Sequence, residues 1–260
     1  MKLSDIIKKE DLFKNPEVGF RIGEYYDKIT HGAIKGQTHV LIGGSGTGKT
    51  HMGVFMACSL LKQGLSVGYL TFEQSPEQIV EMVLANYHGK SDGSIEEWST
   101  VGELPLCVRR FDTGTKESIE LAVKGLSCLD AIVLDYLCPP DDCTETEASS
   151  LRIIMKDLKN WCEEHNQFFF CLMQGRQRDA VSFSTTEQIV GSRQVINPVE
   201  VAIIMNKSDE DGSLELDFIK NRYNTTKYYK IRLIGTMNYE TSTFNEIGVY
   251  SAKGDLINEL

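Results

Sequence analysis

The sequence predicts an α/β fold in which a mostly parallel central sheet is flanked by helices, with antiparallel strands at one edge. Short, continuously apolar runs alternate with segments of helical periodicity as far as residue 174, as is typical of parallel strands joined by crossover helices. A glycine-rich loop follows the first of these strands. Beyond residue 197, strand-like runs joined by turns follow one another without intervening helices, and this pattern predicts the antiparallel edge.

Composition indicates an ordinary globular protein. The 260 residues, 41% hydrophobic and 25% charged, suffice for one large domain with a short appendage. No apolar run approaches the roughly 18 residues that span a bilayer, and residues 1–10 are too charged for a secretory signal. We therefore expect a cytoplasmic protein, in the host cytoplasm if it is viral, with no membrane partner.

Cysteine spacing and net charge narrow the partners further. The seven cysteines form no C-x-x-C pair, which favours free thiols in a reducing compartment over a zinc site. The formal net charge of −10 argues against a general basic surface for nucleic acid. Any contact with DNA should therefore come from a local patch that faces a pore or groove.

The elements begin with an N-terminal segment, residues 1–36, that precedes a domain of residues 37–260. Apolar residues at helical spacing predict a short amphipathic helix in this segment: Leu3, Ile6, Ile7, Leu12 and Phe13. Its apolar stripe must be buried, either against its own domain or on a neighbouring subunit. Both alternatives stay open.

A phosphate-binding loop follows the first predicted strand, residues 38–42, and precedes a predicted helix at 52–61. Its residues match G-x-x-x-x-G-K-[ST], and with His51 they form the predicted nucleotide-binding set: Gly43, Gly44, Ser45, Gly46, Thr47, Gly48, Lys49 and Thr50. The glycines let backbone N–H groups turn toward phosphate oxygens, and the helix N-terminus adds its dipole. We expect Lys49 to reach the β- and γ-phosphates and Thr50 to hold Mg²⁺, so the loop predicts a bound nucleoside triphosphate.

Strands and helices then alternate in order. The predicted strands are 66–72, 106–111, 131–134 and 168–173, and the predicted helices are 75–87, 115–126 and 145–165. Three of these strands end at a polar residue: Glu73, Asp135 and Gln174. Because ligands bind at the carboxyl ends of parallel strands, these side chains should meet at the phosphate loop.

Each strand-end residue suits one step of triphosphate hydrolysis. Asp135 would hold Mg²⁺ through water or through Thr50, and Glu73 is placed to accept a proton from the attacking water. Gln174 can contact the γ-phosphate and report the state of the nucleotide. The alternatives are a turn-capping aspartate, a surface glutamate and a plain strand-end amide.

The C-terminal part of the chain holds a second charged feature. Residues 175–197 form a polar segment that predicts a functional loop, and strand-like runs follow at 199–205, 214–219 and 228–233, which we predict to be antiparallel. Lys220 and Arg222 end the second of these runs on one strand face, where we do not expect them to reach the phosphates of their own domain. They suit delivery of positive charge to a phosphate bound by the next subunit, although a solvated strand edge is the alternative.

These motifs together resemble the RecA-fold motor domain of DnaB-type ring helicases, most of all the helicase half of phage primase–helicases. The matching stretches, in the order and spacing of that family, cover about residues 20–250: 43–50, 67–75, 131–137, 169–174 and 218–223. The resemblance implies that Glu73 is the catalytic base, Gln174 a sensor, and Lys220 with Arg222 a pair that acts in trans. It also implies ATP and Mg²⁺ as cofactors, a homo-oligomeric ring that we expect to be a hexamer, and a separate primase or loader protein.

The resemblance also places a loop facing single-stranded DNA within residues 175–197. The candidate contacts are Arg176, Arg178 and Arg193 with phosphates, and the backbone N–H groups of Gly191 and Ser192. Residues 139–147, which correspond to the other channel loop of the family, depart from it by holding four acids and no base. Acids there would repel a phosphate backbone.

The leading hypothesis is an ATP-dependent DNA helicase or translocase that acts on single-stranded DNA in replication. The alternative is a RecA- or KaiC-like DNA-dependent ATPase that serves as a recombinase, loader or regulatory switch without unwinding. A small-molecule kinase is a third hypothesis, and it would need an acceptor pocket and no role for Arg222.

Overall fold

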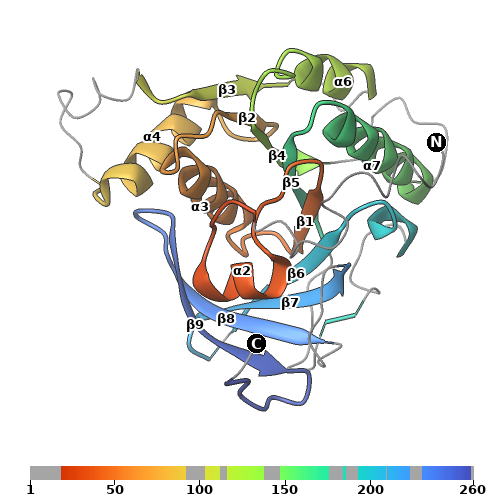
Figure 1. Ribbon diagram of the computed structural model, residues 1–260. Coiled ribbons are helices and arrows are strands. Elements are labelled where there is room, and N and C mark those ends of the chain that lie inside the picture. Colours follow the sequence, from red (N-terminus) through yellow and green to blue (C-terminus); the bar gives the residue numbers. More distant parts are fainter. Residues whose placement is uncertain are drawn as a thin grey trace, which may run out of the picture.

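The described part of the chain forms one α/β unit (Figure 1). The computed structural model describes residues 19–91, 103–111, 116–137, 147–175, 184–185, 193–208, 210–222 and 230–258. The helices are α2 (Glu24–Thr30), α3 (Lys49–Leu61), α4 (Pro76–His88), α6 (Lys116–Lys124), α7 (Glu147–Glu164) and the 3-10 helix η3 (Arg193–Ile196). The strands are β1 (Thr38–Gly43), β2 (Val67–Thr71), β3 (Leu106–Arg110), β4 (Ala131–Leu137), β5 (Phe168–Gln174), β6 (Val201–Lys207), β7 (Leu214–Asn221), β8 (Ile231–Asn238) and β9 (Thr243–Ser251).

The strands form a single mixed sheet in the order β3-β2-β4-β5-β1-β6-β7-β8-β9. The strands from β3 to β6 in this order are all parallel, and β7, β8 and β9 continue the sheet in antiparallel pairings. Strand β1 lies in the middle, paired with β5 on one side and β6 on the other. The predicted fold class, mostly parallel with an antiparallel edge, is confirmed.

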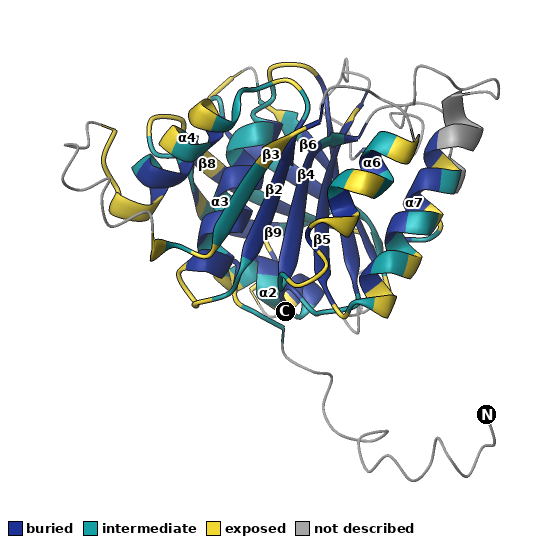
Figure 2. Cartoon of the chain, turned by 90° about the horizontal axis from the view of Figure 1, so that it is seen from above, coloured by how far each residue is buried: buried dark blue, intermediate teal, exposed yellow. Residues whose placement is uncertain are grey.

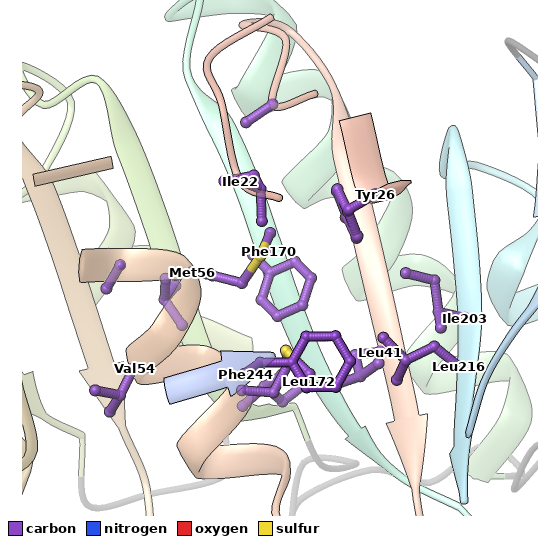
Figure 3. Close-up of a cluster of buried hydrophobic side chains, with 14 of the residues drawn as sticks. Ile22, Tyr26, Leu41, Val54, Met56, Phe170, Leu172, Ile203, Leu216 and Phe244 are labelled. Atoms are coloured by element: carbon purple, nitrogen blue, oxygen red, sulfur yellow. The ribbon is translucent and has the colours of Figure 1, made fainter. Parts of the chain in front are cut away.

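Helices cover both faces of the parallel part, and the sheet lies buried between them (Figure 2). Side chains alternate between the faces along a strand, so Leu41 joins one apolar cluster while Val40 and Ile42 join the other. The Leu41 cluster includes side chains of α3 such as Met56 and extends to Phe244 of β9 (Figure 3). The opposite cluster takes its helical side chains from α6 and α7. Burial on both faces explains why the parallel strands are continuously apolar.

Three elements were not predicted: η3, which lies in the segment expected to be a loop, α2 and β9. The N-terminus of α2 takes its cap from a residue far along the chain, because Glu246 of β9 accepts hydrogen bonds from the N–H groups of Tyr25 (2.7 Å) and Tyr26 (2.9 Å). Strand β9 is an edge strand that pairs with β8 and, through a single bridge at Tyr250, with Leu256, and it buries few side chains, so its sequence shows little alternation. Neither α2 nor β9 has a sequence pattern of its own that predicts a helix or a strand.

Two details of the predicted strands were wrong. Residues 199–205 were expected to be antiparallel, but β6 runs parallel to β1 and only its β7 partner is antiparallel. Asp135 was expected to end its strand, but β4 continues to Leu137, with an irregular register against β5 between Leu134 and Leu137. The aspartate therefore lies inside the strand, where its side chain is 5% exposed.

The predicted N-terminal amphipathic helix lies outside the described residues. The rest of that segment belongs to the same core as the sheet, because Tyr26 and Ile29 of α2 are buried in the Leu41 cluster. An isolated bridge between Phe20 and Ala33 closes the stretch around α2. None of the described helices combines the length and the apolar character needed to cross a membrane.

Candidate nucleotide-binding site

The phosphate loop connects the carboxyl end of β1 to the first turn of α3. Gly46 (φ +74°) and Gly48 (φ +95°) adopt the left-handed conformation that glycine tolerates best. A Cβ at Gly43 would lie 2.7 Å from Thr47 Oγ1, so this position is closed to larger residues. Gly44 is buried, whereas Ser45 and Gly46 are exposed at the tip. The loop thus has the open, glycine-dependent backbone that a phosphate chain requires.

Lys49 lies under this loop with its ammonium group on neutral acceptors. Its Nζ donates to Gly43 O (3.0 Å), Gly44 O (2.7 Å) and Gln174 Oε1 (3.2 Å). Burial lowers the pKa of Lys49, and the negative charges of Asp135 and Glu73 act against that shift. Within the described residues no carboxylate lies at ion-pair distance from this ammonium group, so it can accept an anionic ligand.

Asp135 lies beside the loop in a setting that fixes its orientation. The Tyr69 hydroxyl donates to Asp135 Oδ2 (2.8 Å), and the Thr50 hydroxyl is a second hydrogen-bond partner. Burial raises the pKa of Asp135; the two hydrogen bonds and Lys49 oppose the rise, and the charge of Glu73 adds to it. The role of Tyr69 could not be predicted, because a tyrosine in a buried strand carries no functional signal in the sequence.

Thr50 and Asp135 are the residues that could hold a divalent cation. The hydroxyl and the carboxylate are hydrogen-bonded to each other, and both are oxygen ligands of the kind that Mg²⁺ prefers. The described residues contain no group of three or more His, Cys, Asp and Glu side chains that could hold a metal by themselves. The cation would therefore need further ligands from a bound phosphate chain or water.

Glu73 lies at the tip of a tight turn after β2. The Thr71 hydroxyl donates to Gln74 O (3.0 Å) and accepts from the Gln74 N–H (3.2 Å), which closes the turn around Glu73. Ser75 and Gln78 then form a capping box that starts α4. The carboxylate of Glu73 is exposed, and its charge acts on the pKa of both Lys49 and Asp135.

Gln174 completes this group from the end of β5. It lies opposite Gly43 in the register of β1 and β5, and the next N–H group, that of Gly175, donates to Gly43 O (2.9 Å). The side-chain amide bonds to Lys49 and is exposed. The structure thus brings the predicted strand-end residues to one edge of the sheet, around the phosphate loop.

The turn between β8 and β9 brings to this edge a tyrosine that the sequence did not indicate. A Cβ on Gly48 would lie 3.1 Å from Tyr239 Cε1. The Tyr239 ring meets the ring of His51 edge-on at a centroid distance of 5.0 Å and is 38% exposed. His51, predicted as part of the nucleotide-binding set, also pairs through Nδ1 with Ser242 Oγ (2.9 Å). A partly exposed aromatic face next to the loop offers a stacking surface.

Lys220 and Arg222 lie at the opposite end of the sheet from the phosphate loop. Strand β6 pairs Met205 with Gly43 of the loop, whereas its first residue, Val201, pairs with Asn221 between the two basic residues. Lys220 Nζ donates to Ile196 O (2.8 Å) and Asn197 O (2.8 Å). Burial lowers the pKa of Lys220 to about 8, and the charge of Arg222 acts in the same direction.

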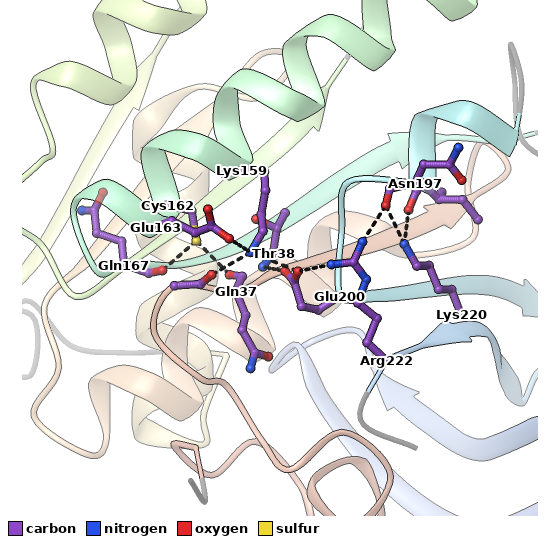
Figure 4. A network of polar contacts seen from close by, with 12 residues as sticks. Gln37, Thr38, Lys159, Cys162, Glu163, Gln167, Asn197, Glu200, Lys220 and Arg222 are labelled. Carbon is purple, nitrogen blue, oxygen red and sulfur yellow. Dashed lines mark hydrogen bonds and ion pairs between the residues drawn. The ribbon is translucent and has the colours of Figure 1, made fainter. Parts of the chain in front are cut away.

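Arg222 contacts the backbone of Asn197, as Lys220 does, and the buried carboxylate of Glu200. Its Nη2 donates to Asn197 O (3.0 Å) and its Nη1 to Glu200 Oε1 (3.3 Å), as Figure 4 shows. The side chain remains 50% exposed. Neither basic residue meets the phosphate loop of its own chain, because the length of β1 separates them from it.

The predicted contacts with DNA lie mostly outside the described residues. This applies to Arg176, Arg178, Gly191 and Ser192. For Arg193 only the backbone is described, and it begins η3. The acidic stretch at 139–146 also lies outside the described residues.

Comparison with known proteins places these features in context. No family model matches the chain. A probable plasmid replicative DNA helicase of Chlamydia trachomatis is 26% identical over 223 residues, which cover 76% of this chain and 49% of the relative. The corresponding protein of Chlamydia muridarum is 22% identical over the same coverage. The chain therefore spans about half the length of the curated relatives it matches.

Solved structures of low sequence identity share the fold. The solved ATPase domain of one helicase superimposes with a TM-score of 0.74 at 13% identity, covering 94% of this chain and 97% of that one. A DnaB-like replicative helicase, solved with attention to its interactions with primase, gives 0.72 at 13% identity, covering 93% and 65%. The RadB recombinase gives 0.62 at 16% identity, covering 86% and 97%. These similarities confirm the RecA-like fold and the resemblance to DnaB-type helicases.

Proposed function

We propose that this chain is the motor domain of a DnaB-type replicative helicase, which hydrolyses ATP to move along single-stranded DNA. One observation carries the proposal. Lys49, Asp135 and Glu73 surround the phosphate loop at one end of the sheet, while Lys220 and Arg222 lie at the other end, too far away to serve the same nucleotide. The similarity to plasmid replicative helicases supports the choice of substrate.

The residues around the loop would divide the hydrolysis reaction among them. Lys49 would contact the β- and γ-phosphates in place of the neutral oxygens that it now meets. Thr50 and Asp135 would hold Mg²⁺, which when bound neutralises charge on the phosphate oxygens. Glu73 would accept the proton of the attacking water, and Gln174 would exchange its bond to Lys49 for one to the γ-phosphate.

Complete catalysis would need a second copy of the protein. Lys220 and Arg222 would reach the triphosphate held by an adjacent subunit and stabilise charge in the transition state, as an arginine finger does. Each subunit would then carry half of two sites, which favours a closed ring, and we propose a hexamer. Docking of residues 1–18 on a neighbour would help to hold this ring together.

The remaining roles are assigned by the resemblance and by the chemistry of the side chains. Arg176, Arg178 and Arg193, with the N–H groups of Gly191 and Ser192, would contact the phosphates of single-stranded DNA in the channel. A separate primase or loader would act with the ring, in the cytoplasm. The exposed ring of Tyr239 would stack on the nucleotide base.

Two measurements test this proposal together. Native mass spectrometry with a non-hydrolysable ATP analogue and a single-stranded oligonucleotide should give a hexamer that holds DNA. The same protein should displace a strand from a 5′-tailed fork with ATP, and the Lys49→Ala variant should not. A monomer that hydrolyses ATP at the full rate without DNA would contradict the proposal.

A second candidate is a DNA-dependent ATPase of the recombinase or loader type. The fold similarity to the RadB recombinase favours it, because that structure covers 86% of this chain. Such a protein would hydrolyse ATP faster with single-stranded DNA and yet leave the fork intact. The fork assay therefore separates the two candidates.

A further inference from the structure

Glu200 is a buried carboxylate that no step of the proposed reaction uses. It immediately precedes β6, and it is 2% exposed. Its Oε1 pairs with Lys159 Nζ (3.0 Å) and Arg222 Nη1 (3.3 Å), while its Oε2 accepts the N–H of Thr38 (2.9 Å), as Figure 4 shows. Two cations and a backbone donor thus share one carboxylate.

Glu200 does not need Arg222 for its own neutralisation. Lys159 comes from α7, is 12% exposed, and donates as well to Gly36 O (2.9 Å), so it is fixed close to the carboxylate. Lys159 also pairs with Glu163 (2.9 Å), but that acid is 59% exposed and screened by solvent, so the lysine and the Thr38 N–H group compensate mainly the buried Glu200. The contact with Glu200 therefore matters more for the orientation of Arg222 than for the neutralisation of Glu200.

Arg222 is the mobile partner in this arrangement. Half of its side chain is exposed, and among the described residues its guanidinium donates to the Glu200 carboxylate and to Asn197 O alone. A free arginine samples many rotamers, and a finger must present one of them to a phosphate. Holding the guanidinium between a buried carboxylate and a backbone carbonyl restricts the side chain to few rotamers before a second subunit binds.

The backbone around Glu200 connects this group to β1. The Glu200 N–H donates to Thr38 O (3.1 Å), and the Arg222 N–H donates to Glu200 O (3.0 Å). Thr38 begins the strand that ends in the phosphate loop. Glu200 therefore lies in direct contact both with the strand that leads to the phosphate loop and with Arg222, the proposed finger.

We propose that Glu200 is a positioning residue for Arg222 and orients its guanidinium toward a triphosphate bound by the adjacent subunit. The inference rests on the proposed function, because Arg222 needs a site in trans to act on. Glu200 itself does not contact the nucleotide. Glu200→Gln should lower kcat about 10- to 100-fold and leave nucleotide affinity within about twofold. Adding it to Arg222→Ala should lower kcat no further than Arg222→Ala alone.

A mixing experiment distinguishes positioning in trans from a structural role. Subunits with Lys49→Ala have an intact finger and no working phosphate loop, whereas Glu200→Gln subunits have the reverse. Mixed rings should hydrolyse ATP several-fold faster than the sum of the two variants alone, because intact fingers then face intact loops. If Glu200 served only its own phosphate loop through Thr38, mixing would give no gain, and that result would overturn the inference.

Controls separate failure of this inference from failure of the proposed function. A mixture of Arg222→Ala and Lys49→Ala subunits tests the trans-acting finger itself. No gain in that mixture overturns the finger, whereas a gain there without a gain for Glu200→Gln overturns the positioning role alone. Glu163→Gln, which removes the exposed acid on the other side of Lys159 (2.9 Å), is the matched variant and should keep full activity.

Folding is checked by thermal unfolding of each variant. If Glu200→Gln does not fold, Glu200→Asp keeps the charge and shortens the reach by one methylene. Glu200→Asp should lose less activity than Glu200→Gln, and its rate of ATP hydrolysis should also rise on mixing with Lys49→Ala subunits. Full activity of a folded Glu200→Asp or Glu200→Gln protein would overturn the inference as well.

Discussion

The two ends of strand β1 are built on opposite electrostatic principles. At the carboxyl end, Lys49 donates to three neutral oxygens and has no carboxylate at ion-pair distance among the described residues, so its charge remains available to a ligand. At the amino end, Glu200 and Lys159 neutralise each other in a buried setting, and His39 is buried and uncharged. Arg222 extends from that end with half of its side chain exposed. The carboxyl end thus leaves a cation without a charged partner among the described residues, whereas the amino end pairs its cations with buried Glu200.

Lys49→Ala tests the carboxyl end of β1, and we expect it to reduce ATP hydrolysis and nucleotide affinity more than any other change. Removing the ammonium group takes away the charge that the phosphate loop offers to the β- and γ-phosphates. We expect hydrolysis to fall by at least about 10³-fold and nucleotide affinity to fall with it. Steady-state phosphate release and equilibrium binding of a fluorescent ATP analogue measure both quantities.

The matched control for this change is Lys28→Ala. Lys28 lies on α2 and pairs with Glu24 at the surface, so its loss should leave both quantities unchanged. Normal nucleotide affinity in Lys49→Ala would mean that the neutral oxygens around this lysine are its permanent partners.

Arg222→Ala tests the amino end of β1, and it should affect hydrolysis without affecting nucleotide binding. Because Arg222 lies at the far end of the sheet, its loss should reduce hydrolysis about 10³-fold and leave nucleotide binding intact. The same two assays, carried out on the assembled protein, separate the effects. Arg21→Ala, which removes an exposed arginine before α2, provides the comparison. Normal ATP hydrolysis by a lone Arg222→Ala subunit would rule out a finger that acts in trans.

His39 should make the amino end of β1 sensitive to acid. Its ring is fully buried, its Nδ1 pairs with the Tyr26 hydroxyl (2.8 Å), and burial together with the charge of Lys159 lowers its pKa to about 3. An unfolded histidine takes up a proton near pH 6.5, whereas the folded one does not. The free energy of unfolding should therefore decline as the pH falls from 6.5 toward 3, by up to about 4 kcal/mol.

Urea unfolding at a series of pH values checks this dependence. His39→Asn keeps an acceptor near Tyr26 and removes the titrating ring, so its stability should vary less over the same range. His88→Asn removes an exposed histidine at the end of α4 and should leave the slope unchanged. An identical slope in His39→Asn and the unmodified protein would assign the acid sensitivity to other groups.

The carboxyl end of β1 was predictable because its signals are local. The spacing of Gly43 to Thr50 follows an apolar strand, and Glu73 and Gln174 each follow another. Parallel strands that are buried on both faces are continuously apolar, so β1, β2, β4 and β5 were visible from composition alone. Their convergence followed from the rule that parallel strands share a carboxyl edge.

At the amino end, the position of Lys220 and Arg222 away from the phosphate loop was predictable, but their partners were not, because those contacts join distant parts of the chain. Glu200 accepts the N–H of Thr38, which lies 162 residues away in the sequence, and Glu246 accepts the N–H of Tyr25, which lies 221 residues away. Nothing next to Glu200 in the sequence marks it as different from the surface glutamates. Residues of this kind are identified only when the fold has brought their partners to them.

Tyr239 joins the nucleotide end of β1 for the same long-range reason, and it offers the smallest of the expected effects. Its ring lies against Gly48 and His51 and is partly exposed, so it can stack on a base without touching the phosphates. Stacking of one base contributes on the order of 1–3 kcal/mol, so Tyr239→Ala should weaken ATP binding by about 5- to 150-fold. The rate at saturating ATP should change little. Inorganic tripolyphosphate, which has no base, should bind the variant and the unmodified protein equally, as measured by competition with the fluorescent analogue.

Variants at two tyrosines sharpen this test. Tyr239→Phe keeps the ring and should bind ATP normally, because the proposed contact uses the aromatic face and not the hydroxyl. Tyr87→Ala removes a tyrosine of similar exposure at the end of α4 and should have no effect. Equal weakening of ATP and tripolyphosphate by Tyr239→Ala would show that the ring supports the phosphate loop through Gly48. The end of β1 that receives the anion would then depend on the β8–β9 turn for its shape, and recognition of the base would have to come from another part of the chain.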